Sequence, residues 1–369
     1  MREPSELEPV GVNEVRHRGQ RLVYFGGADY LRFSWHPEVR TAVTRTVETD
    51  GPSACASRLT TGNRTIYADL ERALRRFFGF ESATLTSSGY AAPLVAAQAL
   101  APDHTHVLVA EGAHACLQDA ATLTRLPVTR FPASDPDALR AAMRRCGRNR
   151  RVLVLTDGMS AVAGTVPPLA DYAAAMPSDC TLLVDDAHGA GVLGRRGRGS
   201  LEHCGVRSDR IVLTVTFSKA LGVYGGAVLG AREVRQKIFE RSALFTGNTV
   251  LPPPWAAGAL AALELLRREG RVRRARLWEN AARLRHTLAQ AGVTAVNEGP
   301  GPVVPLALAD TVGMECLCRR LRAAGIHPPL IRYPNGPAER FLRFAVSSEH
   351  TAAELAAVCE VVQDFLRRA

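Results

Sequence analysis

The stretch "TVTFSKALGVYGG", residues 214–226, contains Lys219, one of two lysines in a chain of 369 residues. The other is Lys237, whereas Lys and Arg together number 46, so nearly every basic side chain is an arginine. A surface charge can be either residue, but a guanidinium does not deprotonate in proteins and cannot act as a nucleophilic amine. The lysine at this position therefore indicates chemistry that needs an amine.

Lys219 follows an apolar run that is typical of a buried strand. Similar runs, bounded by turn residues, alternate along the chain with segments of helical period. The expected strands are 83–89, 106–111, 128–132, 151–158, 180–187, 210–218 and 225–230. The runs are continuously hydrophobic rather than alternating, which predicts an α/β fold with a mostly parallel sheet covered by helices on both faces.

The length predicts two domains. We expect a large domain over residues 40–250, which holds all seven strands. Residues 251–369 are expected to form a long connector helix, which begins at residue 251, followed by a smaller α+β domain. The N-terminal segment 1–39 is expected to contribute to the small domain.

Composition limits the class of protein. Apolar residues make up 46% and charged residues 22%, as in ordinary globular proteins. The chain has no apolar run long enough for a membrane helix or a signal core, so we expect a soluble, cytoplasmic protein that does not bind membranes. The net charge of +10 is scattered without interleaved aromatic residues, which favours a solvated surface over a nucleic-acid partner. Eight cysteines show no CxxC pair or zinc spacing, so we expect reduced thiols and no metal site.

Polar residues gather where predicted strands end, which is where ligands bind in such sheets. In "LLVDDAHGAG" an apolar run ends at Asp185, and Asp186 and His188 follow. Carboxylates at a buried strand end are costly unless a cation or a hydrogen-bond donor accompanies them. The alternative is a pair of helix N-caps with His188 as a core residue.

Two further strand ends suit a phosphate group. Thr216 and Ser218 flank the lysine, and hydroxyl and backbone N–H groups beside a cation favour an anion. In "TSSGYAAPLVAA" a strand runs into Ser88, Gly89 and Tyr90 immediately before a helix, whose first N–H groups can hold a phosphate. An ordinary serine N-cap is the alternative for that stretch alone.

Together these stretches supply an amine, a buried carboxylate with a nearby histidine, and a helix start that can hold phosphate. Pyridoxal 5′-phosphate (PLP) requires this set. Its aldehyde bonds to a lysine, its protonated pyridine nitrogen lies beside an aspartate, and its phosphate is bound at a helix N-terminus. The sequence therefore predicts a PLP site.

The motifs also resemble those of a known group. From about residue 22 to the C-terminus, the stretches "DYLRFSWHPEV", "ASRLTTGN", "SSGYAA", "VDDAHGAGVLGRRGRG", "TFSKALGVYGG" and "LRFAVSSEHTAAEL" are similar to those of the α-oxoamine synthases. This group of fold-type I PLP-dependent enzymes includes 8-amino-7-oxononanoate synthase, 2-amino-3-ketobutyrate CoA ligase and serine palmitoyltransferase. The resemblance implies a fold-type I PLP-dependent transferase, with a mostly parallel seven-stranded sheet, a smaller α+β domain and a homodimer with shared active sites.

The resemblance also implies roles for individual residues. Lys219 matches the Schiff-base lysine, Asp185 the partner of the pyridinium, and His188 the donor to the phenolic oxygen. His114 matches the residue that stacks on the ring, and Arg343 the arginine that receives the amino-acid carboxylate, a task that suits a bidentate fork. A surface arginine at a strand end is the alternative for Arg343. The implied phosphate contacts are Ser88, Gly89, Tyr90, Thr216, Ser218 and, across the dimer interface, Thr249.

Several substrate-side positions depart from the group. Ala28 replaces an asparagine that helps bind the substrate carboxylate, Ala113 replaces the asparagine before the stacking histidine, and Pro93 replaces another asparagine. A serine that contacts the cofactor is Ala161 here, unless Ser160 takes its place. The cofactor residues are retained while these positions differ, which predicts an unusual substrate, as a specialised biosynthetic pathway requires.

We consider three functions. The first is condensation of an amino acid with an acyl thioester, carried by CoA or an acyl carrier protein, with decarboxylation to an α-amino ketone. The second is an aminotransferase or an aldolase-type C–C lyase, which the loss of asparagine at Ala28 favours mildly. The third is a non-catalytic binding protein, which the joint retention of Lys219, Asp185, His188 and His114 disfavours.

Overall fold

The structure is a computed structural model, and it describes residues 6–147, 150–293, 299–308, 310–333 and 336–368. The chain divides into two compact units. The larger unit comprises Phe33–Ser160 and Val166–Arg271, and the smaller unit comprises Met1–Arg32, Ala161–Thr165 and Val272–Ala369. No helix in the described ranges is long and apolar enough to cross a membrane.

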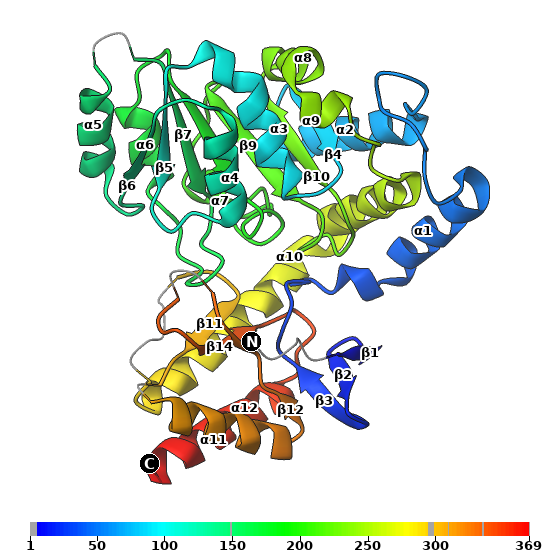
Figure 1. The fold of residues 1–369 in the computed structure, drawn as a ribbon. Coiled ribbons are helices and arrows are strands. Elements are labelled where there is room, and N and C mark those ends of the chain that lie inside the picture. The colour runs from blue at the N-terminus through cyan, green and yellow to red at the C-terminus, as the bar shows by residue number, and fades with distance from the viewer. Residues whose placement is uncertain (1–5, 148–149, 294–298, 309, 334–335, 369) are drawn as a thin grey trace. The chain divides into compact units, whose positions relative to one another are not determined.

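The larger unit is built on a seven-stranded sheet with the strand order β4-β10-β9-β8-β7-β5-β6 (Figure 1). The strands are β4 (Ser82–Thr86), β5 (His106–Ala110), β6 (Val128–Phe131), β7 (Val152–Asp157), β8 (Thr181–Asp185), β9 (Ile211–Thr216) and β10 (Gly226–Gly230). Strand β10 runs antiparallel to both of its neighbours, and the other neighbouring strands are parallel. The predicted α/β fold with a mostly parallel seven-stranded sheet is confirmed.

Helices of the larger unit pack around the sheet, as Figure 1 shows, whereas α1 lies away from it. The helices of this unit are α1 (Pro37–Asp50), α2 (Thr65–Phe78), α3 (Ala91–Leu100), α4 (Ala115–Leu123), α5 (Pro136–Arg145), α6 (Leu169–Ala175), α7 (Ser200–His203), α8 (Arg232–Arg241) and α9 (Ala243–Thr246), with one-turn 3-10 helices at Phe33–Trp35 and Ala101–Asp103. The alanine-rich helix α3 is buried on most sides because it packs against β4, β9, β10, α4 and α8. Small side chains permit such close packing on several faces.

Helix α2 shows how local sequence fixes one of these elements. Leu70, Leu74 and Phe77 recur at helical spacing and are buried, whereas the arginines of the helix lie on its other face. The helix ends at Gly79, whose φ of 81° is left-handed and suits glycine. Because its apolar face is buried against the sheet, α2 is held by packing as well as by its own hydrogen bonds.

The smaller unit contains two small sheets and two complete helices. One sheet has the order β1-β2-β3-β12 and the other the order β11-β14-β13. The strands are β1 (Glu8–Gly11), β2 (Glu14–His17), β3 (Gln20–Tyr24), β11 (Val303–Leu306), β12 (Ile326–His327), β13 (Leu330–Ile331) and β14 (Phe341–Ala345), and the helices are α11 (Thr311–Ala323) and α12 (Ala352–Arg368). Helix α10 (Pro253–Gln290) continues from the larger unit into this one. A core that includes Phe25, Leu317 and Phe344 fills the unit.

A buried ion pair joins several elements of the larger unit. Arg58 Nη1 donates to Glu71 Oε1 at 2.7 Å, and both residues are buried. Glu71 Oε1 also accepts from the main-chain N–H of Leu85 in β4 at 3.2 Å, and Arg235 of α8 approaches the other carboxylate oxygen at 3.2 Å. One carboxylate on α2 therefore fixes the preceding loop, the edge strand and α8.

Replacing Glu71 with alanine is expected to lower the free energy of unfolding by about 3–5 kcal/mol, because it leaves the buried Arg58 without its partner. The matched control is Glu264→Ala on α10, which removes a pair with Arg267 whose two side chains are 51% and 62% exposed. We expect that control to cost less than about 1 kcal/mol. Urea unfolding followed by circular dichroism measures both, and equal losses would contradict the structural role of Glu71.

Candidate active site

Three strands of the larger unit end side by side. Strand β7 ends at Asp157, β8 at Asp185 and β9 at Thr216. The register pairs Asp157 with Asp185, and Asp185 with Thr214. Because the carboxyl ends of parallel strands share one edge of a sheet, both carboxylates lie beside the segment that leads from Thr216 into Lys219.

Asp185 is buried and held by two donors. Thr214 Oγ1 donates to its Oδ1 at 3.0 Å, and Cys116 Sγ donates to its Oδ2 at 3.3 Å. A carboxylate has about four lone-pair positions, so these two contacts leave capacity for a further donor. The protonated ring nitrogen of PLP is a donor of this kind, and Asp185 therefore fits the cofactor.

His114 begins helix α4 beside the same carboxylates. Its Nδ1 accepts from the main-chain N–H of Cys116 at 3.3 Å, and its own main-chain N–H donates to Asp157 Oδ2 at 3.0 Å. The Tyr90 ring meets the imidazole edge-on, with 6.0 Å between the ring centroids. Burial lowers the pKa of His114, an effect that Asp185 opposes and the charge of Lys219 reinforces. The imidazole is therefore a neutral, flat surface at this site.

Asp157 is strongly perturbed by its surroundings. Burial and the charge of Asp185 raise its pKa to about 8, although the His114 N–H and Lys219 act in the opposite direction. Burial and the same neighbouring carboxylate also raise the pKa of the Cys116 thiol, which Lys219 opposes. Lys219 therefore acts electrostatically on His114, Asp157 and Cys116 alike.

The turn before helix α3 forms the neighbouring part of the site. Ser88 Oγ accepts from the main-chain N–H of Ala91 at 3.1 Å. A Cβ atom at Gly89 would lie 2.3 Å from the Cβ of Thr216, so only glycine lets this turn approach the end of β9. Thr216 Oγ1 in turn accepts from the Ser218 N–H at 3.2 Å. The α3 N-terminus and these hydroxyls form an arrangement that fits a phosphate group.

Thr249 lies in the loop between α9 and α10. It lines a small cavity together with Ser87 and Arg58. Its neighbour Asn248 donates to Ser87 Oγ at 3.1 Å. The structure therefore brings this loop to the turn that precedes α3.

Asp186 and His188 are buried in the turn after β8. Asp186 Oδ2 accepts from the main-chain N–H of Ser200 at 2.8 Å, at the first turn of α7. Asp186 thus binds the first N–H of α7 from a distant position in the chain, whereas the N-cap residue of that helix is Gly199. His188 follows Asp185 by three residues, so it lies at the same strand end.

Arg343 belongs to the smaller unit, in β14 opposite Pro305 of β11. Its Nε donates to the main-chain oxygen of Ala161 at 2.9 Å. The backbone of the segment that departs from the α-oxoamine synthase pattern thus orients this guanidinium. All the other predicted site residues lie in the larger unit.

Sequence reasoning missed three residues of the site. Asp157 ends an apolar strand in the same way as Asp185, so the strand-end rule contained the signal. Thr214 is a hydroxyl inside a buried strand, and Cys116 looks like a small core residue. Neither of these two carries a local signal, because each is defined by its hydrogen bond to Asp185 across the sheet.

The fold and the strand-end site define the class as PLP-dependent transferases of fold type I. The family model "Aminotransferase class I and II" matches residues 22–362, and the chain belongs to this family. A putative 8-amino-7-oxononanoate synthase from Phenylobacterium zucineum is 38% identical over 359 residues, which cover 96% of this chain and 90% of the relative. One from Desulforudis audaxviator is 35% identical over 351 residues, 95% of this chain and 90% of the relative.

A solved structure agrees with these relatives. Serine palmitoyltransferase from S. paucimobilis, with PLP–myriocin bound, superposes with a TM-score of 0.92 at 26% identity, covering 99% of this chain and 92% of the other. Both named enzymes are α-oxoamine synthases, and the predicted membership of that group is confirmed.

Replacing Asp157 with asparagine is expected to change the pH dependence of stability. The folded wild type keeps a proton up to about pH 8, whereas the unfolded chain loses it above the ordinary carboxyl pKa, so this group destabilises the fold as pH rises between those values. The stability of D157N relative to wild type should therefore increase with pH, by at most about 1.4 kcal/mol per unit. Urea unfolding of the cofactor-free protein from about pH 5 to pH 8 measures the trend.

Asparagine keeps an oxygen that can accept from the His114 N–H, so this variant removes the titration and not the hydrogen bond. Asp171→Asn, which removes an exposed carboxyl from α6, is the control for the loss of one negative charge. A difference between D157N and wild type that stays constant with pH would contradict the raised pKa of Asp157.

Proposed function

We propose that the protein binds PLP at the strand-end site and condenses an amino acid with an acyl thioester, with decarboxylation, to give an α-amino ketone. The observation that supports this proposal is the buried Asp185 at the strand end, whose carboxylate accepts hydrogen bonds from Thr214 and Cys116, beside groups whose pKa values respond to the charge of Lys219. The names of the relatives, an 8-amino-7-oxononanoate synthase and a serine palmitoyltransferase, support this reaction class.

The residues around Asp185 would hold the cofactor. Lys219 would bond to its aldehyde carbon, Asp185 would hold the proton on its ring nitrogen, and the His114 imidazole would stack on the ring. The phosphate would lie against the α3 N-terminus, where its contacts would be Ser88, Gly89, Tyr90, Thr216 and Ser218. When bound, PLP supplies an electron sink for a carbanion at the substrate α-carbon.

The protein's own groups supply the rest of the chemistry. The Lys219 amine would serve as the general base that takes the α-proton of the substrate. Thr214 and Cys116 hold the Asp185 carboxylate in place, and this carboxylate would accept from the protonated ring nitrogen. His188 donates to the oxygen on which negative charge develops during condensation. Arg343 receives the substrate carboxylate in a bidentate contact.

The assembly and location follow from the same proposal. We propose a homodimer with shared active sites, in which Thr249 reaches the phosphate of the partner's cofactor. The division into an N-terminal segment 1–39, a PLP-binding domain 40–250 and a C-terminal segment 251–369 is proposed as the functional domain organisation. A cytoplasmic location is proposed as well, and the thioester is carried by CoA or by an acyl carrier protein.

The reaction is tested by adding amino acids and an acyl-CoA to the PLP-loaded protein. We expect thiol release that requires the amino acid and is matched by carbon dioxide. The replacement of a carboxylate-binding asparagine by Ala28 favours a second candidate, an aminotransferase or an aldolase-type C–C lyase. Amino transfer to a 2-oxo acid, or cleavage of the amino acid, without thiol release from any acyl-CoA or acyl carrier protein would support that candidate and contradict condensation.

Lys219→Ala is expected to abolish covalent attachment of PLP. Borohydride reduction followed by peptide mass spectrometry should locate the pyridoxyl group on the peptide that contains Lys219 in the wild type and on no lysine in the variant. The chain offers a matched control, because its one other lysine is Lys237. Lys237 lies on α8, and its Nζ forms an ion pair with Asp103 at 2.8 Å. K237A should retain the visible absorbance band and the modified peptide. A modified Lys237 in wild type would contradict the assignment.

A further inference from the structure

The larger unit contains a second cavity, of about 830 Å³, at the other end of the sheet from the PLP site. Its lining includes Ser208 and Asp209, which precede β9, and Gly230, the last residue of β10. The proposed PLP site follows the other end of β9, at Thr216. Six strand residues rise about 3.3 Å each, so roughly 17 Å separates the two ends and the cavity is a distinct site.

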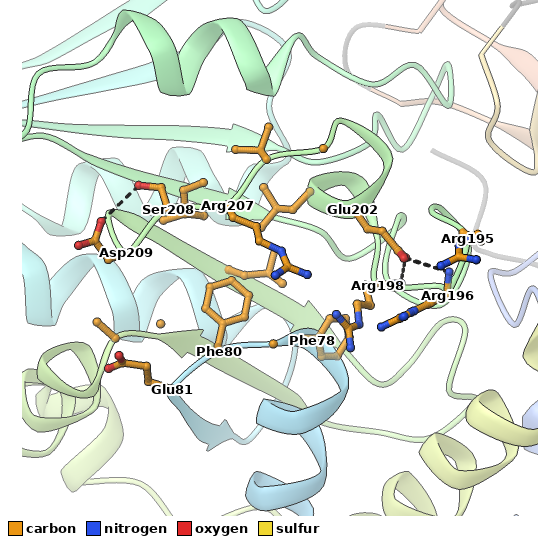
Figure 2. Close-up of a pocket in the computed structure, with 18 residues that line it drawn as sticks. Phe78, Phe80, Glu81, Arg195, Arg196, Arg198, Glu202, Arg207, Ser208 and Asp209 are labelled. Atoms are coloured by element: carbon orange, nitrogen blue, oxygen red, sulfur yellow. Dashed lines mark hydrogen bonds between the residues drawn. The ribbon is translucent and has the colours of Figure 1, made fainter.

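One end of this cavity is rich in arginine. Arg195, Arg196 and Arg198 lie at that end, and Arg207 lies nearer the middle of the view, above Phe80 (Figure 2). The loop from Arg195 to Arg198 is held in place by Glu202, whose carboxylate accepts from the main-chain N–H groups of Arg196 and Arg198 at 3.0–3.1 Å. Glu202 therefore orders the loop through the main-chain N–H groups of Arg196 and Arg198.

The positive charges lie close enough to repel one another. Burial lowers the pKa of Arg198, Arg196 and Arg207 reinforce that effect, and Glu202 opposes it. The enclosed Nε of Arg198 has no hydrogen-bond partner in the part of the chain that the structure describes. Neither Arg196 nor Arg207 forms an ion pair with a carboxylate among the described residues. An anion between these side chains would relieve the repulsion and satisfy the donors.

The remainder of the cavity has a different character. The half-buried ring of Phe80 lies in the middle of the view in Figure 2, below Arg207. Glu81 and Asp209, both exposed, lie at the end away from the arginine loop. From one end to the other, the cavity thus presents guanidinium groups that can donate hydrogen bonds to a phosphate, an aromatic surface, and two carboxylates that can accept hydrogen bonds.

We propose that this cavity binds a nucleotide, with its phosphate groups on the arginines, its base against Phe80, and its amino or hydroxyl groups donating to Glu81 and Asp209. Each part matches a known preference: guanidinium groups bind phosphate oxygens in bidentate fashion, and aromatic side chains stack on bases. The volume falls in the usual range of small-molecule sites, which is about 300–1,000 Å³. The nucleotide is either free or the adenine nucleotide portion of CoA.

Isothermal titration calorimetry on the PLP-loaded protein tests this proposal with ADP, CoA, adenosine and inorganic phosphate as probes. Loading the protein with PLP prevents the inorganic phosphate probe from binding at the proposed PLP site. ADP should bind saturably and at least about tenfold more tightly than phosphate or adenosine, since only ADP engages both ends. If CoA displaces ADP, the natural ligand is the nucleotide portion of CoA. If CoA does not displace ADP, the natural ligand is a free nucleotide.

The pocket variant is Arg196→Ala/Arg207→Ala, which changes two exposed side chains and leaves Glu202 and the core intact. It should weaken ADP binding by about tenfold or more. The control is Arg144→Ala/Arg145→Ala, which removes the same charge from exposed positions on α5 and should leave ADP binding unchanged. Phe80→Ala should weaken ADP but not phosphate.

Three outcomes overturn the proposal: no saturable ADP binding, equal ADP affinity in the pocket variant and the wild type, or phosphate that binds as tightly as ADP. The last result would mean an adventitious anion only. The measurement requires no turnover, so it is independent of whether the proposed condensation occurs.

Discussion

Two carboxylates that end adjacent parallel strands impose the main electrostatic constraint on this protein. Asp157 and Asp185 lie in register on β7 and β8, and the charge of Asp185 raises the pKa of Asp157. Such a pair is tolerable only with donors and a cation nearby. Thr214, Cys116 and the His114 main chain supply the donors, and Lys219 supplies the positive charge.

The surrounding elements are arranged to meet that constraint. Helix α4 begins at Ala115 because the imidazole of the preceding His114 caps it, and Asp157 accepts from the main-chain N–H of His114. The turn before α3 approaches β9 as closely as it does because Gly89 has no side chain beside Thr216. These contacts bring an amine, a carboxylate, a flat imidazole and a helix N-terminus to one edge of the sheet. A group with an aldehyde, a basic ring nitrogen and a phosphate matches that combination.

The two ends of the sheet in the larger unit differ in charge, because parallel strands gather their carboxyl ends at one end of the sheet and their amino ends at the other. Strands of one direction place their carboxyl ends together, and in this chain those ends carry Asp157 and Asp185. The loops at the opposite edge carry arginines, including the ordered loop from Arg195 to Arg198. Around this cavity several arginines gather, and two of them, Arg196 and Arg207, form no ion pair with a carboxylate in the part of the chain that the structure describes. The sequence alone does not distinguish the arginines of this cavity from those on the surface, because "GRRGRG" (194–199) is one of several arginine-rich stretches. The folded structure brings this stretch beside Arg207.

Much of the fold could be predicted from the sequence. Continuous apolar runs located the seven strands of the large sheet, because a strand buried on both faces does not alternate between apolar and polar residues. The differences lie at the strand ends: the first strand was predicted to reach residue 89, whereas β4 ends at Thr86. The hairpin strands β1 to β3 have mostly half-exposed or exposed residues and gave no such signal. The family was also predictable, because its motifs lie in order along the chain.

The sequence by itself determined the chemical parts of the proposed site: the rare lysine, the strand-end aspartate and the glycine before a helix. Only the tertiary structure decided which groups surround them. Cys116 and Thr214 contact Asp185 from positions 69 and 29 residues away. The Arg58–Glu71 pair and the arginine cavity likewise unite separate segments. Hydrophobic periodicity and turn chemistry act between near neighbours in the chain, whereas hydrogen bonds and charge clusters depend on distances that only the packed sheet fixes.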